Sequence, residues 1–417
     1  MAAQDENDGG ARGALSEGGE RRGGGLPTRP FLVIYVAWHP AFADGARVAK
    51  TLYEHFRRNL YRNVAGGAGL PVMYRSAPMH GSDVPIDIDL DDAETSAIVM
   101  LVDDAWTNDS AWAAWSRALM ERTDAAGLRA RVFPIAMTPT AISMGMAEQA
   151  ARWDRWGELT PEQRDRRLAT DLTYQFCRML RSYLERLRHP DDAPDALIQY
   201  LRKVEVFLSH SKHDAYGESI ARRIREKLHA SEGLDSFFDV HDIPTGVRFN
   251  QAILQKVRVS AVVAIHTDSY SSREWCRREV LEAKRWNVPL VVADCISEAD
   301  ERGFPYLGNV PVVRMDPATA DRIEQVIGRL LDEVLKDFLW RCWVRLVGGE
   351  RAGVIFIPRP PELIALAGVA AAAGGGTTLV YPEPPLGAEE QNLFEVVAPG
   401  LRLRSMTEWL AEGGELA

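Results

Sequence analysis

Short apolar runs alternate with amphipathic segments along the chain from residue 31 onward. The runs at residues 31–37 and 96–102 contain no charged side chain, which is typical of strands buried on both faces of a parallel sheet. Segments such as 45–52 and 161–187 have apolar residues three and four positions apart, as amphipathic helices do. Because strands that alternate with helices form parallel sheets covered on both faces, the pattern predicts an α/β fold.

Three pairs of matched segments indicate an internal repeat. In each copy a glycine begins an amphipathic helix, a Ser-Ala-aliphatic strand follows, and another apolar strand comes last. The pairs are GARVAKTL (45–52) with GESIARRI (217–224), SAIVMLVDDAW (96–106) with SAVVAIHTDSY (260–270), and VFPIAM (132–137) with VPLVVA (288–293). All three pairs occur in the same order at nearly constant separation, so duplication explains them better than chance.

The repeat predicts tandem domains. We expect a flexible tail at residues 1–29, because its Gly-rich polar composition cannot bury enough surface to fold. The first α/β domain then covers residues 30–190 and the second covers 200–340. The segment 188–195 is rich in Pro and Asp and reads as a linker.

The chain ends in a small α/β region at residues 341–417, after a long helix expected over 318–346. Its apolar runs predict strands at 354–357 and 378–381, with a helix at 362–373 between them. Two short helices are expected to follow the second strand.

Composition narrows the class of protein. The chain has 417 residues and a net charge of −10, which argues against a dominant nucleic-acid-binding surface. Its four cysteines show no metal-ligand spacing and suit a reducing compartment. The longest apolar stretch, residues 363–376, is shorter than the roughly 20 residues of a membrane span, and we find no signal peptide. We therefore expect a cytoplasmic protein with no membrane partner and no metal.

Four motifs in the second copy resemble, in order, those of the Toll/interleukin receptor (TIR) domain. They are VFLSHSKHD (206–214), SFFDVHDIPTG (236–246), SAVVAI (260–265) and YSSREWCRREV (270–280). The last resembles the family's Ser-x-Trp-Cys-x-x-Glu signature, with Ser272 one place earlier than in that pattern. The resemblance covers about a third of the chain closely, and the first copy resembles the family only loosely.

This resemblance implies two tandem TIR-like domains with flavodoxin-like parallel sheets flanked by helices. It also implies NAD as a substrate, not a cofactor, and Glu279 as the catalytic residue of a bacterial NAD-cleaving type. In such sheets ligands bind beyond the carboxyl ends of the strands. The residues expected to bind the substrate there are Ser209, Ser211, Lys212, Asp239 and Trp275. The loop after the second strand is expected to serve assembly through Asp242, Pro244, Gly246 and Arg248.

The first copy lacks the features that carry this chemistry. Aligned without a gap, Trp115 stands where Glu279 stands in the second copy. Matching Trp112 to Trp275 places Ser116 there instead, and neither alignment supplies a carboxylate. We therefore expect the first copy to be a degenerate TIR-like domain with a packing, sensing or assembly role.

The leading hypothesis is an NAD glycohydrolase (NAD nucleosidase), activated by self-association or by an upstream sensor protein or nucleotide signal, in bacterial anti-phage defence or signalling. One alternative is a non-enzymatic adaptor that acts through TIR–TIR contacts. Another is an ADP-ribosyl cyclase that makes a nucleotide signal. The sequence leaves these open, because all three use the same domain.

Overall fold

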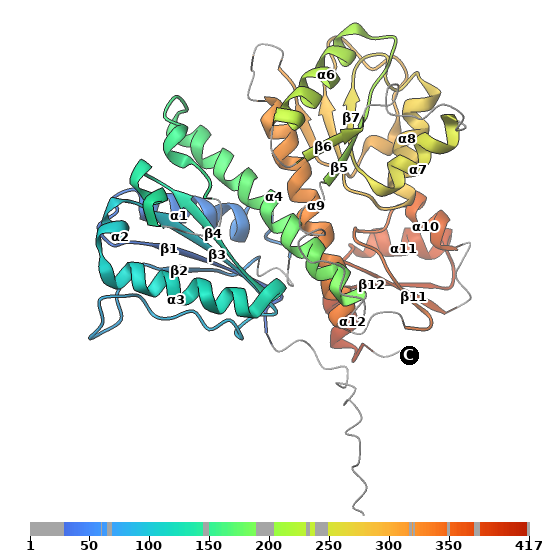
Figure 1. The fold of residues 1–417 in the computed structure, drawn as a ribbon. Coiled ribbons are helices and arrows are strands. Elements are labelled where there is room, and N and C mark those ends of the chain that lie inside the picture. The colour runs from blue at the N-terminus through green and yellow to red at the C-terminus, as the bar shows by residue number, and fades with distance from the viewer. Residues whose placement is uncertain are drawn as a thin grey trace, which may run out of the picture.

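The computed structural model describes residues 29–59, 61–64, 69–144, 150–188, 204–230, 234–237, 249–316, 319, 322–347, 351–370 and 376–414. Nearly all of the predicted tail, and the predicted linker after residue 188, lie outside the described residues. Within the described part the strands form three parallel sheets flanked by helices (Figure 1). The predicted α/β class is therefore confirmed.

The middle sheet has five strands in the order β6-β5-β7-β8-β9, which is the flavodoxin-like order predicted for this part of the chain. Helices α7 and α8 pack on one face, and α6 and α9 pack on the other. The carboxyl ends of the parallel strands therefore meet at one open edge. The bounds are β5 Val204–Ser209, α6 Ala215–Ala230, β6 Leu234–Phe237, α7 Phe249–Val259, β7 Ala261–His266, α8 Glu274–Arg285, β8 Leu290–Asp294, η5 Pro305–Leu307, β9 Val312–Arg314 and α9 Arg322–Leu346.

The N-terminal sheet has the order β2-β1-β3-β4, which matches the first four positions of the middle sheet. Among the described residues of this domain, one parallel bridge between Ile135 and Ala151 stands in place of a fifth strand. Helices α1 and α4 cover one face, and α2 and α3 cover the other. The bounds are β1 Leu32–Trp38, α1 Gly45–Tyr53, η1 Glu54–Arg58, β2 Val72–Arg75, β3 Thr95–Val102, α2 Asp104–Asn108, α3 Ser110–Ala126, η2 Gly127–Arg129, β4 Ala130–Ala136, η3 Pro139–Met144, η4 Trp153–Arg155 and α4 Pro161–Arg188.

The matched glycines of the repeat have a structural reason. A Cβ on Gly45 would lie 2.2 Å from the indole of Trp38, and a Cβ on Gly217 would lie 3.2 Å from Thr267. Both positions stand in helices that approach the end of a neighbouring strand closely, so a side chain there would collide or crowd. The first match of the repeat thus reflects helix–strand packing in both domains.

Sheet register corrects one detail of the repeat. Ile98 of β3 pairs with Val132, whereas Val262 at the matched position of β7 pairs with Leu290. Val132 therefore corresponds to Leu290 and not to Val288, as the sequence match had it. A shift of two residues keeps every side chain on the same face of a strand, so the apolar pattern could not reveal it. The duplication itself stays a prediction.

Helices α4 and α9 pack against each other and join the two larger domains (Figure 1). One continuous apolar cluster runs from β1 and β3 through both helices to β5 and β7. At its rim the buried carboxylate of Asp332 on α9 accepts a hydrogen bond from the Tyr61 hydroxyl at 2.7 Å and lies 3.1 Å from Nε2 of His55. The two domains therefore share one core and a buried polar contact.

A titratable carboxyl on α4, one of the two helices that join the domains, makes the stability of the protein depend on pH. Burial raises the pKa of Asp171 from 3.8 to about 6. A raised folded-state pKa means that folding favours the protonated acid, so stability falls as the pH rises from about 4 to about 6. We expect Asp171→Asn to raise the free energy of unfolding at pH 7 by about 1–2 kcal/mol and to have little effect at pH 3.5. Urea unfolding at both pH values measures this, and an equal effect at both would contradict it.

The C-terminal region is a separate three-stranded sheet in the order β10-β11-β12. The two expected strands and the expected helix between them are present, but β12 was missed. Its sequence, LRLRS, alternates apolar and charged residues and is only partly buried, so it lacks the unbroken apolar run of a central strand. The bounds are β10 Val354–Phe356, α10 Leu363–Ala370, β11 Thr377–Tyr381, α11 Ala388–Val397, β12 Leu401–Ser405 and α12 Met406–Ala411.

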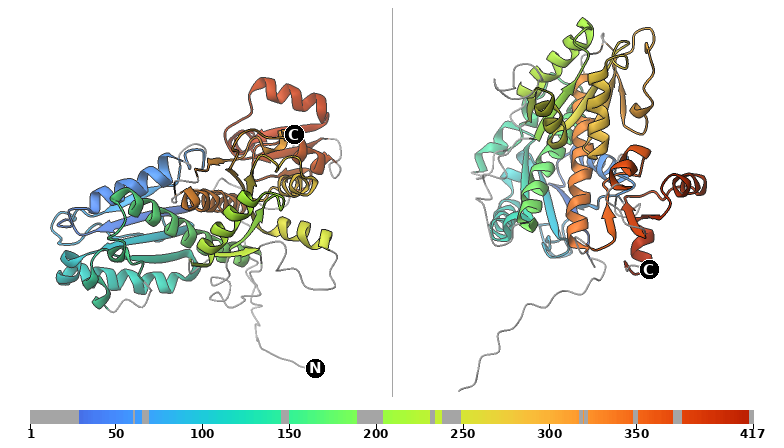
Figure 2. Two further views of the ribbon diagram at one scale, coloured as in Figure 1. Left: turned by 90° about the horizontal axis from the view of Figure 1, so that it is seen from above. Right: turned by 90° about the vertical axis from the view of Figure 1, so that its right-hand side faces the viewer.

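This C-terminal sheet lies against the middle domain, where α10 packs on α8 (Figures 1 and 2). Among the described residues, no helix combines the length and the apolar character needed to cross a bilayer.

Candidate functional site

Helix α8 places a glutamate on its buried side. Cys276, Glu279, Val280 and Ala283 are buried at positions i, i+3, i+4 and i+7, which is the stripe that an amphipathic helix turns toward a sheet. Glu279 is only 4% exposed although its side chain carries a carboxylate. A buried carboxylate needs hydrogen-bond partners to offset its lost hydration, so its surroundings define a candidate site.

A chain of hydroxyl groups holds this carboxylate. The Ser209 hydroxyl, at the carboxyl end of β5, donates to Oε2 of Glu279 at 2.5 Å. The Tyr270 hydroxyl lies 2.6 Å from Oγ of Ser209 and donates to it, since the serine proton is already used. Burial raises the pKa of Tyr270 well above its usual 10, so the phenol keeps its proton and remains a donor. All three residues are buried.

Three of the residues predicted to bind substrate lie near the same edge of the sheet, in different settings. Ser211 is buried and accepts a hydrogen bond from the Ser269 hydroxyl at 3.1 Å. Lys212 is exposed in the loop after β5. Trp275 lies in the first turn of α8, where the Arg278 guanidinium stacks over its ring at 4.3 Å. The structure thus brings Ser209 to Glu279 directly, and it places the others along the loop and helix that border the pair.

Two groups of predictions fall outside the described residues. They are the substrate-binding Asp239 and the assembly-loop residues Asp242, Pro244, Gly246 and Arg248. These five residues stay predictions.

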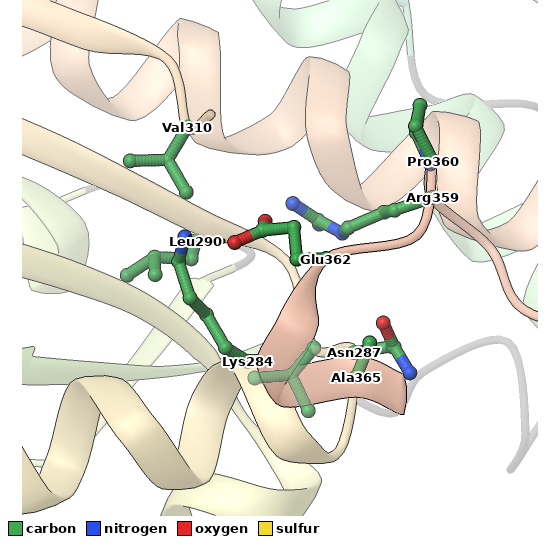
Figure 3. A pocket seen from close by; sticks show the side chains of 9 residues that line it. Lys284, Asn287, Leu290, Val310, Arg359, Pro360, Glu362 and Ala365 are labelled. Atoms are coloured by element: carbon green, nitrogen blue, oxygen red, sulfur yellow. Dashed lines mark hydrogen bonds and ion pairs between the residues drawn. The ribbon is translucent and has the colours of Figure 1, made fainter. Parts of the chain in front are cut away.

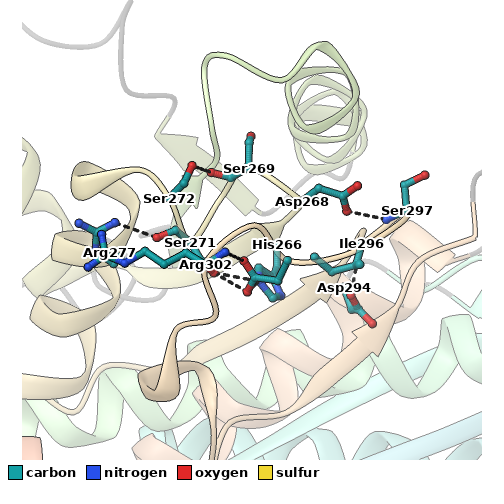
Figure 4. Close-up of polar contacts among 11 residues, drawn as sticks. His266, Asp268, Ser269, Ser271, Ser272, Arg277, Asp294, Ile296, Ser297 and Arg302 are labelled. Atoms are coloured by element: carbon teal, nitrogen blue, oxygen red, sulfur yellow. Dashed lines mark hydrogen bonds and ion pairs between the residues drawn. The ribbon is translucent and has the colours of Figure 1, made fainter.

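A polar cluster that the sequence did not predict closes the neighbouring end of β7 (Figure 4). Nε2 of His266 lies 2.9 Å from Oδ2 of Asp300 and 3.2 Å from Oγ of Ser271, and the Ser271 hydroxyl also donates to Asp300 at 2.7 Å. Arg277 of α8 donates to the backbone carbonyl of Ser271 at 2.8 Å. The three side chains already satisfy one another, so the cluster fastens the loop after β8 to the start of α8.

Tyr270 and this cluster carried only a weak signal in the sequence. Tyr270 stands at the first position of the recognised YSSREWCRREV motif, but nothing in the spacing indicates that its hydroxyl reaches β5. Asp300 lies 34 residues after His266, and only the parallel order of β7 and β8 brings them together. Such contacts depend on the sheet and not on local sequence.

The N-terminal domain lacks counterparts of both Ser209 and Glu279, the two partners of the hydrogen bond at the candidate site. Ile34 of β1 pairs with Ala97 of β3, and Val206 of β5 pairs with Ala261, the matched alanine of β7. Ala37 and Ser209 each lie three residues after these strand partners. Ala37 therefore stands in β1 where Ser209 stands in β5. The burial pattern of α3 favours the alignment without a gap, which places Trp115 where Glu279 stands. Trp115 packs there with Trp106 and Trp112, so aromatic side chains fill this part of the N-terminal domain.

Comparison with known proteins identifies the middle domain. Residues 206–327 match the family model described as TIR domain. That range runs from β5 into α9 and contains Ser209, Tyr270 and Glu279. A search of curated protein sequences finds no match to the chain. The middle domain of this chain is therefore a member of the TIR domain family.

Proposed function

We propose that the TIR domain cleaves NAD at the bond between nicotinamide and ribose, with Glu279 as the catalytic carboxylate. The observation that supports this most is the position of Glu279, which is buried at the carboxyl edge of the sheet and hydrogen-bonded to Ser209. Doubly wound sheets bind their ligands at this edge. A carboxylate kept there at the cost of its hydration suits a reaction that develops positive charge.

The chemistry requires only one carboxylate. Glycosidases ordinarily use two, one to protonate the leaving group and one to stabilise the oxocarbenium-like centre. Nicotinamide in NAD is already a cationic pyridinium and leaves as a neutral molecule, so no acid is needed. A single carboxylate beside the ribose can hold its hydroxyl groups and stabilise the charge as the bond breaks. Water then completes the hydrolysis.

The proposed enzyme depends on activation. Glu279 is almost completely buried, so a ribose reaches its carboxylate only after a rearrangement, during which Ser209 can keep its hydrogen bond to Oε2. TIR domains commonly self-associate, and we propose that self-association or an upstream signal supplies the rearrangement. The N-terminal domain, in which neither Ser209 nor Glu279 has a counterpart, would then serve packing, sensing or assembly. This suits an effector in bacterial anti-phage defence or signalling.

The test is release of nicotinamide from NAD by the purified protein, both dispersed and clustered through a fused oligomerisation tag. We expect release to be low in dispersed protein and to rise on clustering. Clustered protein that consumes no NAD would contradict the proposal and favour the adaptor. The other product separates the two enzymatic functions, because hydrolysis gives linear ADP-ribose whereas a cyclase gives a cyclised form.

The hydroxyl chain provides a graded prediction. Ser209→Ala removes the hydrogen bond to Glu279, so the carboxylate loses a fixed orientation. We expect kcat for NAD cleavage to fall about tenfold, which corresponds to one hydrogen bond to a charged group. Tyr270→Phe leaves Ser209 in place and should reduce kcat by less than Ser209→Ala does. If Tyr270→Phe is the more damaging change while both variants remain folded, Ser209 does not orient Glu279.

A further inference from the structure

The last turn of α8 carries a buried lysine that connects three parts of the protein. The side chain of Lys284 is only 6% exposed. Its Nζ lies 2.7 Å from Oε2 of Glu362, just before α10 of the C-terminal region, and donates to the carbonyl oxygen of Gly308 at 2.6 Å. Figure 3 shows Lys284 and Glu362 pointing toward each other in the pocket between the TIR domain and the C-terminal region. This ammonium therefore joins α8, the segment before β9 and the C-terminal region.

The same helix carries Glu279, so its contacts at either end fix one rigid element. Near the amino end, Arg277 bonds the backbone of Ser271 and Glu279 bonds Ser209. At the carboxyl end, Lys284 makes the two contacts described above. Glu279 and Lys284 are five residues apart, which is about 7.5 Å along a helix axis. A tilt at one end of this short helix therefore moves the other.

We propose that Lys284 is a positioning residue for Glu279, and that Glu362 makes the C-terminal region part of the support of the TIR site. This inference rests on the NAD-cleaving function proposed above. Lys284 touches no reacting atom, and it acts by fixing the carboxyl end of α8 to the segment before β9 and to the C-terminal region. The C-terminal sheet thereby gains a role that neither its sequence nor its own fold indicates.

The physical basis is the cost of leaving a buried charge without a partner. A buried ammonium that loses its carboxylate draws in water or moves toward solvent, and either movement displaces the helix that carries it. Misplacement of a reacting group by about 1 Å can lower a rate by a factor on the order of 100. The binding of NAD uses a wider surface and depends less on one carboxylate. Loosening α8 should therefore lower kcat more than it raises KM.

The test is a double-mutant cycle with Lys284→Met, Glu362→Gln and the double variant, made in the full chain and assayed in the clustered form. We expect each single change to lower kcat about tenfold while KM changes less than about twofold. The double variant should be no worse than the worse single variant, because both changes remove one contact. Arg222→Met, which breaks the exposed pair of Arg222 with Glu218 on α6, serves as the control and should leave kcat unchanged.

Amide hydrogen exchange of α8 supplies a readout that does not depend on activity. We expect exchange at residues 276–282 to rise in both single variants and to stay unchanged in Arg222→Met. Unchanged kcat, additive effects in the double variant, or unchanged exchange in α8 would each overturn the inference. If the wild type cleaves no NAD while exchange in α8 still rises in both single variants, the proposed function is refuted. The mechanical link between α8 and the C-terminal region then still holds.

Discussion

Glu279→Gln is expected to lower NAD cleavage by the clustered protein at least about 100-fold. Glutamine keeps the size of the side chain and can still accept the Ser209 hydrogen bond, so the packing of α8 is preserved. It removes the negative charge that would stabilise the developing oxocarbenium-like centre. The loss should therefore appear in kcat, with the melting temperature close to that of the wild type. Nicotinamide release measured at saturating NAD is the assay.

The matched control for this variant is Glu274→Gln, which changes an exposed glutamate in the first turn of the same helix. Its NAD cleavage should stay within about twofold of the wild type, since removal of one favourable charge at a helix amino terminus costs at most about 1 kcal/mol of stability. If Glu279→Gln clusters normally and releases as much nicotinamide as the wild type, Glu279 is not the catalytic group. The adaptor function would then account for the TIR domain better.

Asp332→Ala is expected to reduce the free energy of unfolding by about 3 kcal/mol. The carboxylate of Asp332 is the buried acceptor for Tyr61 and lies beside His55, at the contact between α9 and the N-terminal domain. Alanine leaves the Tyr61 hydroxyl buried without that partner and creates a cavity at the contact between α9 and the N-terminal domain. Because α4 and α9 share one apolar core, the loss should weaken both domains. Urea unfolding followed by fluorescence measures it.

Two further variants separate the causes of this loss. Tyr61→Phe removes only the donor hydroxyl and should cost about 1 kcal/mol, since a water molecule or His55 can still satisfy Asp332. Asp332→Asn keeps an acceptor oxygen and should fall between Tyr61→Phe and Asp332→Ala. If Asp332→Ala unfolds at the same urea concentration as the wild type, this polar contact does not hold the domains together.

Local patterns predicted much of the fold correctly. Apolar runs gave β1, β3, β5 and β7, because a strand covered by helices on both sides is apolar along most of its length, and only the exposed Glu205 near the start of β5 interrupts its run. The helix predicted over 161–187 is α4, whose buried side repeats every three to four residues. The edge strand β12 was missed because arginines alternate with its leucines and the strand is only partly buried, which weakens the apolar signal.

The candidate site was predictable in part. Glu279 has two local signals, its place in the Trp-Cys-x-x-Glu motif and its position on the apolar stripe of an amphipathic helix. Ser209 follows from the resemblance as a residue at the end of a strand. That these two share a hydrogen bond does not follow, since 70 residues separate them along the chain.

The sequence by itself determined most of the strands and helices, that the chain is built from parallel α/β units, and that the second unit carries a TIR signature with Glu279. Hydrophobic periodicity and residue spacing encode these features locally. Only the tertiary structure decided that Ser209 and Tyr270 hold Glu279, that Asp332 joins α9 to the N-terminal domain, and that Lys284 ties α8 to the C-terminal region. Each of these contacts joins residues from different elements, and their distances depend on sheet order and helix packing, which no local pattern specifies.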